Sequence, residues 1–110
     1  MKRLIIFFML SNVSALNHAC AEELFNERQA ELTDLLLQDC GSCHGMTLKG
    51  SLGPAITSEA LANKSEEEIF LTISNGRPGT PMPPWKNILS EADIQWLVST
   101  LKNGVDHEKK

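Results

Sequence analysis

The sequence predicts an all-α fold in which helices are joined by loops rich in glycine and proline. Apolar residues recur at helical spacing in three segments, and no run alternates apolar and polar residues as a half-buried strand does. Four of the five prolines lie between residues 78 and 84, where they indicate an extended, stiff and irregular loop. With 110 residues, the chain is long enough for one small domain.

The first helix is expected over residues 28–41, since its apolar positions follow helical spacing: Leu32, Leu35, Leu36 and Cys40. A middle helix is expected over residues 66–75, where Ser65 and Glu68 form a capping box. Its apolar face comprises Ile69, Thr72 and Ile73, and Asn75 and Gly76 provide a stop. A short turn is expected over residues 58–63.

The terminal helix has the clearest pattern. Ser90 and Asp93 resemble a cap pair, and Asn103 with Gly104 ends the segment. Four apolar residues between these signals follow the i, i+3, i+4, i+7 pattern: Ile94, Leu97, Val98 and Leu101. From about residue 104 we expect a charged tail that frays.

Cys40-Gly41-Ser42-Cys43-His44 is the most informative stretch, because Cys-x-x-Cys-His is the attachment signature of a c-type haem. On one helical turn, Cys40 and Cys43 can reach the two vinyl groups of one porphyrin edge. His44 is then expected to be the proximal iron ligand. The motif predicts one covalently attached haem c per chain.

Two other uses of this motif remain open. A structural zinc site needs four Cys or His ligands, and outside the motif the chain offers only Cys20, His18 and His107. A redox dithiol of the thioredoxin kind requires a βαβ context, and no strand-like alternation surrounds the motif.

The N-terminus has the features of a signal peptide. Two basic residues precede an apolar run that is too short to span a membrane, and Ala19-Cys20-Ala21 resembles a peptidase site. We expect residues 1–21 to be removed and residues 22–110 to form a periplasmic domain. Alternatively, a lipoprotein peptidase cuts before Cys20 and the thiol is acylated, although Asn17 stands where a lipobox usually carries leucine.

Removal of residues 1–21 leaves 8 basic and 14 acidic residues, a net charge of −6. Such a domain is not suited to nucleic acid or anionic lipid, and its charge either favours a partner with a basic docking patch or merely maintains solubility. A chain this small has a marginal core, so we expect haem to complete the core and the haem-free form to fold poorly.

Methionine is the expected sixth ligand of the iron, since no second histidine is suitably placed. Met82 is favoured over Met46, which follows His44 too closely to reach the other side of the haem. Prolines at 81, 83 and 84 would restrict the loop around Met82. The alternative is that Met82 only fills a gap in the core.

Three further residues are candidates for contacts around the haem. Pro54 is expected to supply the carbonyl that accepts the free N–H of the proximal imidazole. Arg77 and Trp85 could bind a buried propionate through charge and an indole N–H. The alternative for Pro54 is a plain turn proline, and Arg77 and Trp85 could equally be surface or packing residues.

These motifs together resemble the class I cytochromes c. More narrowly, the chain is similar to the cytochrome c55X family, small periplasmic monohaem proteins associated with cytochrome cd1 nitrite reductase in denitrifying bacteria. The similarity rests on LLLQDCGSCHGMTLKGSLGPAIT, SNGRPGTPMPPW and WLVSTLK, which cover most of the mature domain. Ser51 departs from the glycine expected in a KGGLGP version of the motif.

The resemblance implies a monomeric electron carrier that accepts electrons from an upstream donor and delivers them singly to cytochrome cd1 nitrite reductase. An alternative is a role in making or inserting the haem d1 of that reductase, and a third is gas binding by displacement of Met82. We do not expect an enzyme, since no nucleophile and base pair accompanies the iron.

Overall fold

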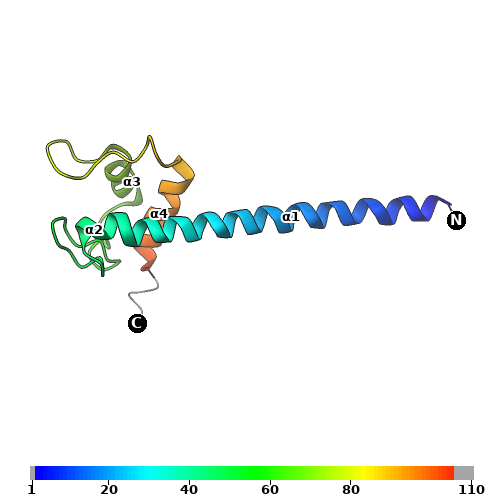
Figure 1. Ribbon diagram of the computed structural model, residues 1–110, viewed down its shortest axis with the longest axis horizontal. Coiled ribbons are helices and arrows are strands. Elements are labelled where there is room, and N and C mark those ends of the chain that lie inside the picture. Colours follow the sequence, from blue (N-terminus) through cyan, green and yellow to red (C-terminus); the bar gives the residue numbers. More distant parts are fainter. Residues whose placement is uncertain (1, 106–110) are drawn as a thin grey trace. The chain divides into compact units, whose positions relative to one another are not determined.

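The computed structural model describes residues 2–105, with side chains from residue 17 onwards, and separates into two compact units at residue 33. No β-strand occurs among residues 2–105 (Figure 1), so the predicted all-α class is confirmed. None of the helices within the described part is long and apolar enough to cross a membrane. His107 and the charged tail beyond residue 105 lie outside the described residues.

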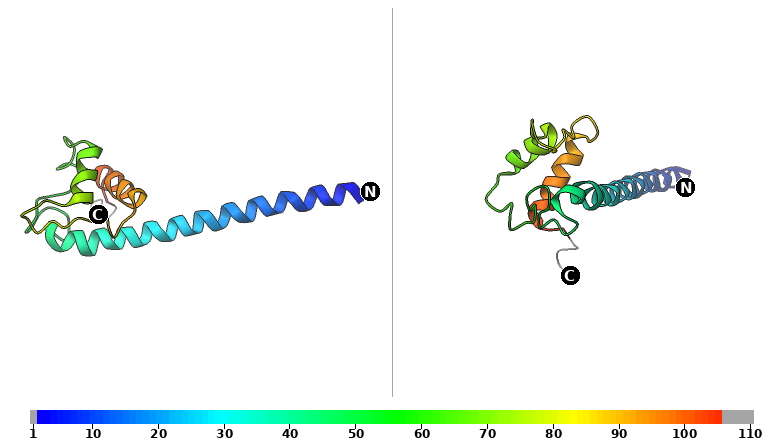
Figure 2. Two further views of the ribbon diagram at one scale, coloured as in Figure 1. Left: turned by 90° about the horizontal axis from the view of Figure 1, so that it is seen from above. Right: turned by 60° about the vertical axis from the view of Figure 1, so that its left-hand side comes forward.

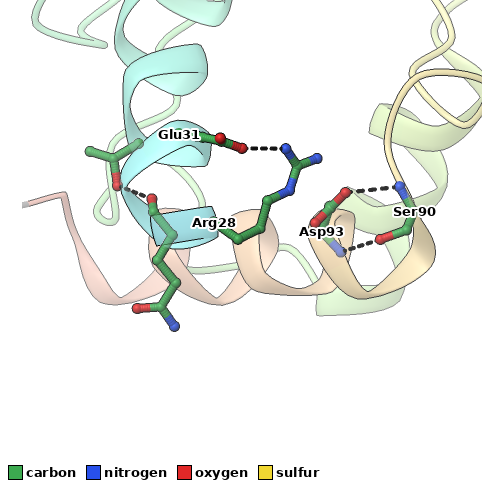
Figure 3. A network of polar contacts seen from close by, with 6 residues as sticks. Arg28, Glu31, Ser90 and Asp93 are labelled. Carbon is green, nitrogen blue, oxygen red and sulfur yellow. Dashed lines mark hydrogen bonds and ion pairs between the residues drawn. The ribbon is translucent and has the colours of Figure 1, made fainter. Parts of the chain in front are cut away.

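The first helix differs from its prediction at both ends. Helix α1 spans Lys2–Leu35, so it begins well before residue 28 because helix-forming Ala, Glu and Leu residues precede that position. In this helix, Arg28 forms an ion pair with Glu31 at 2.7 Å (Figure 3). The expected helix does continue through residue 41, but Leu36–Cys40 forms a π-helical turn, η1, which the sequence pattern did not predict.

The π-helical turn leads directly into the haem motif. Gly41 donates its N–H to the carbonyl of Leu36, a bond that encloses one residue more than in an α-helix. The short helix α2, Gly41–His44, follows at once. Apolar periodicity does not reveal a single widened turn of this kind. Leu36, at the start of the turn, is buried just as the helical pattern predicts.

Helices α3 (Glu66–Asn75) and α4 (Glu91–Asn103) confirm the two later predictions and pack against each other (Figure 2). Each begins at a serine cap: the Ser65 hydroxyl accepts from the Glu68 N–H, and Ser90 forms a reciprocal capping box with Asp93 (Figure 3). The four predicted apolar residues of α4 are all buried. The expected turn over residues 58–63 is also present.

The core of the second unit combines these helices with the loops between them. Leu48, in the loop after α2, is fully buried and adopts a left-handed backbone with φ of 60°. Its burial anchors that loop in the core. The other buried side chains of this unit include Leu36, Leu61, Ile69, Leu89, Ile94, Leu97, Val98, Leu101 and Val105.

Candidate functional site

The second unit contains a cavity of about 560 Å³, a volume typical of ligand sites. All seven residues that the sequence singled out as site candidates line it: Cys40, Cys43, His44, Pro54, Arg77, Met82 and Trp85. Met46 does not line the cavity and is 61% exposed. The structure therefore gathers residues that are up to 45 positions apart in the chain around one space.

His44 is oriented by the loop that follows it. Its Nδ1 atom lies 2.7 Å from the carbonyl oxygen of Pro54. Since a carbonyl can only accept, this contact requires the proton on Nδ1 and leaves the Nε2 lone pair available to a metal. Gly53 lies against the same ring, since a Cβ built there would be 2.9 Å from both Nδ1 and Cε1.

The loop over residues 45–56 is tied to the motif by backbone hydrogen bonds. The N–H of Gly53 donates to the Cys43 carbonyl and the N–H of Gly50 donates to the His44 carbonyl, both at 2.7 Å. Leu48 adds the buried side chain that anchors the loop. These contacts fold the loop back so that the Pro54 carbonyl reaches the imidazole of His44.

The two motif cysteines are free thiols, and both are partly buried. Burial, reinforced by the nearby Asp39 carboxylate, raises the pKa of Cys40 to about 11. Its thiol is therefore neutral at physiological pH, which disfavours thiolate chemistry before any covalent attachment.

Residues 76–85, the methionine loop, return to the C-terminal end of α3. The backbone N–H of Arg77 donates to the Met82 carbonyl at 3.1 Å, and the backbone N–H of Trp85 donates to the Ile73 carbonyl at 3.0 Å. Gly76 makes the turn possible: it has φ of 64°, and a Cβ there would lie 2.6 Å from the Met82 carbonyl oxygen. These contacts hold Met82 at the cavity wall.

The remaining wall is largely apolar. The predicted face of α3, formed by Ile69, Thr72 and Ile73, lines the cavity. Sequence patterns did not identify several other lining residues: Leu52, Leu61, Lys64, Thr80 and Leu101. Leu101 belongs to a pattern that predicted burial but not what it would face, whereas Thr80 in its proline-rich loop carried no signal.

The donor set fits a covalently attached haem. Two thiols at one site, an imidazole with a free Nε2 and a thioether from a separate loop are the groups that a His/Met haem requires. The described residues contain no group of three or more His, Cys, Asp or Glu side chains able to hold a metal ion. They also form no strand, so neither the zinc nor the dithiol alternative gains support over residues 2–105.

Comparison with known proteins identifies similar sequences and a similar solved structure. The family model described as "Cytochrome C oxidase, cbb3-type, subunit III" matches residues 27–99. Proteins named cytochrome c55X are 60% identical over 70% of this chain in Pseudomonas aeruginosa and 56% identical over 71% in Stutzerimonas stutzeri. One from Paracoccus denitrificans is 47% identical over 67% of this chain.

These matches cover 65%, 69% and 72% of the respective relatives, so the chain spans slightly less than two thirds of the first. A solved structure titled "c-type cytochrome NirC" is 57% identical, with a TM-score of 0.68. That match covers 70% of this chain and 91% of the solved one.

Proposed function

Since the chain belongs to the cytochrome c family, in the branch named cytochrome c55X, we propose that it transfers single electrons to cytochrome cd1 nitrite reductase. The family is one of electron carriers rather than enzymes, and its members hold haem c covalently. The observation that carries the proposal is that one cavity is lined by Cys40, Cys43, His44 and Met82.

Each of these residues has a separate task. Cys40 and Cys43 would hold the haem through thioether bonds, and the haem would supply a reversible one-electron couple. His44 would bind the iron through Nε2, while its Nδ1–H donates to the Pro54 carbonyl. Met82 would provide a thioether as the second protein ligand, a choice that raises the reduction potential and suits a carrier.

Arg77 and Trp85 are proposed to bind propionate groups. Both line the cavity, Arg77 with an exposed side chain and Trp85 with a half-buried one. A guanidinium and an indole N–H are suitable donors for carboxylates. Their contribution is expected to orient the haem within the apolar cavity.

The proposed reductase partner follows from the similarity to cytochrome c55X. Stopped-flow mixing of the reduced holoprotein with oxidised cytochrome cd1 nitrite reductase, at several salt concentrations, tests it directly. We expect rapid oxidation of haem c that persists near physiological salt, with a salt slope that reports charge steering between the proteins.

Transfer too slow to support turnover would contradict electron delivery and favour the alternative role in haem d1 assembly. A gene deletion separates the two roles independently. Loss of an electron donor leaves a reductase complete in haem d1 but starved of electrons, whereas loss of an assembly factor leaves a reductase that lacks haem d1.

We also propose that residues 1–21 are a signal peptide and that the mature protein is periplasmic. The basic start, the short apolar run and the small residues around Cys20 support this. Mass spectrometry of the protein from its native host tests it: a chain that begins at Glu22 is expected. An acylated N-terminal Cys20 would establish the lipid-anchored alternative instead.

A further inference from the structure

The methionine loop has few backbone donors with which to hold its shape. In the stretch Pro81-Met82-Pro83-Pro84, Met82 carries the single N–H, because proline has none. The partner of that N–H is therefore an important determinant of how the loop presents Met82.

The partner is the side chain of Thr80. Its Oγ1 atom lies 3.3 Å from the Met82 nitrogen, from which it accepts a hydrogen bond. The same hydroxyl donates to the carbonyl oxygen of Arg77 at 2.6 Å. A hydroxyl has one donor and two acceptor positions, so both bonds form together.

Backbone contacts complete a closed ring around this hydroxyl. The Thr80 N–H donates to the same Arg77 carbonyl at 3.1 Å, and the Arg77 N–H donates to the Met82 carbonyl at 3.1 Å. Met82 is thus held on both sides, at its N–H by a side chain and at its carbonyl by the backbone. The contact at the N–H depends on the identity of residue 80.

We propose that Thr80 is the positioning residue for Met82, with its hydroxyl setting the direction in which the thioether enters the cavity that both residues line. The inference rests on the proposed role of Met82 as an axial ligand. Serine offers the same hydroxyl, whereas valine has the shape of threonine without either bond. This difference makes the inference testable.

The test measures how readily added imidazole displaces methionine from the iron of the oxidised holoprotein. Thr80→Val removes two solvent-exposed hydrogen bonds, at 2.6 and 3.3 Å, so imidazole is expected to bind up to roughly tenfold more tightly than to the wild type. Thr80→Ser should recover most of this difference. The sulfur-to-iron charge-transfer band should weaken in the valine variant and recover in the serine variant.

Thr100→Val is the matched control, because Thr100 is a half-buried residue of α4 outside the cavity wall. It should bind imidazole like the wild type. Urea unfolding of all variants shows whether a general loss of stability accompanies the change. A purely structural role would lower stability without the selective gain in imidazole affinity.

Met82→Ala is measured in parallel to separate the two hypotheses. If it abolishes the charge-transfer band while Thr80→Val matches the wild type, the positioning role is wrong and the ligand assignment stands. If Thr80→Ser behaves like Thr80→Val, the hydroxyl is not the cause and the inference is also overturned. If Met82→Ala keeps the band, both assignments fail.

Discussion

The Nδ1 atom of His44 and the carbonyl oxygen of Pro54 lie 2.7 Å apart, although the two residues are ten positions apart in the sequence. This hydrogen bond selects the imidazole tautomer whose free Nε2 can bind a metal. Gly53 allows the approach because it presents no side chain to the ring. A carbonyl and a missing side chain together determine where the imidazole lies.

Gly53→Ala is expected to displace the His44 ring. The new Cβ would lie 2.9 Å from two ring atoms, and overpacking of this kind costs about 1–3 kcal/mol. We expect a lower midpoint of urea unfolding and an altered proximal iron–nitrogen vibration in resonance Raman spectra. Gly41→Ala is the control, since a Cβ there meets nothing closer than 3.8 Å and should leave the vibration unchanged.

Met82→Ala is expected to remove the sixth iron ligand. The sulfur-to-iron charge-transfer band should disappear, the reduction potential should fall, and the reduced protein should bind CO readily. Met46→Ala provides a matched control because Met46 is exposed and does not line the cavity. An intact band in Met82→Ala, or its loss in Met46→Ala, would refute this assignment.

Gly76→Ala should disrupt the methionine loop through a steric clash. Its Cβ would lie 2.6 Å from the Met82 carbonyl oxygen, in addition to the strain of an alanine at φ of 64°. Gly79→Ala carries comparable strain at φ of 79° but meets no atom within 4 Å. Urea unfolding should therefore show a greater loss for Gly76→Ala, and equal losses would mean that the clash relaxes away.

Ser90→Ala removes the N-terminal cap of α4. The Ser90 hydroxyl accepts from the Asp93 N–H at 3.1 Å, and the substitution should cost about 1 kcal/mol of unfolding free energy. Ser99→Ala, at an exposed position within the same helix, is expected to change stability little. A cost for Ser90→Ala no greater than for Ser99→Ala would contradict the capping role.

The Cys40 thiol should react slowly with iodoacetamide in the haem-free chain. Burial and Asp39 raise its pKa to about 11 from an ordinary 9.0, so the reactive thiolate is scarce below pH 11 and increases about tenfold per pH unit. Because the haem-free form is expected to fold poorly, the measurement uses a chain with Cys20 and Cys43 changed to serine under conditions where circular dichroism shows it to be folded. The same chain in denaturant, where the pKa returns to its ordinary value, should react much faster at pH 8; equal rates would contradict the prediction.

The sequence by itself determined the features that depend on neighbouring residues. The bounds of the helix over residues 66–75 and the cap at Ser90 follow from groups within one or two turns of each other. Cys40, Cys43 and His44 are recognisable for the same reason, because the motif for haem attachment spans only five consecutive residues. The all-α class follows from apolar periodicity, which also operates over a few residues.

Only the tertiary structure decided the contacts made where the chain reverses direction. Periodicity does not show which carbonyl faces His44 or why a side chain at residue 53 would clash with its ring. It also does not show which groups form hydrogen bonds with the Thr80 hydroxyl. It also missed the π-helical turn before Gly41, because one widened turn leaves the pattern of buried residues almost unchanged. The residues that form the motif could be identified from the sequence, whereas the groups that orient them depend on how the loops fold back.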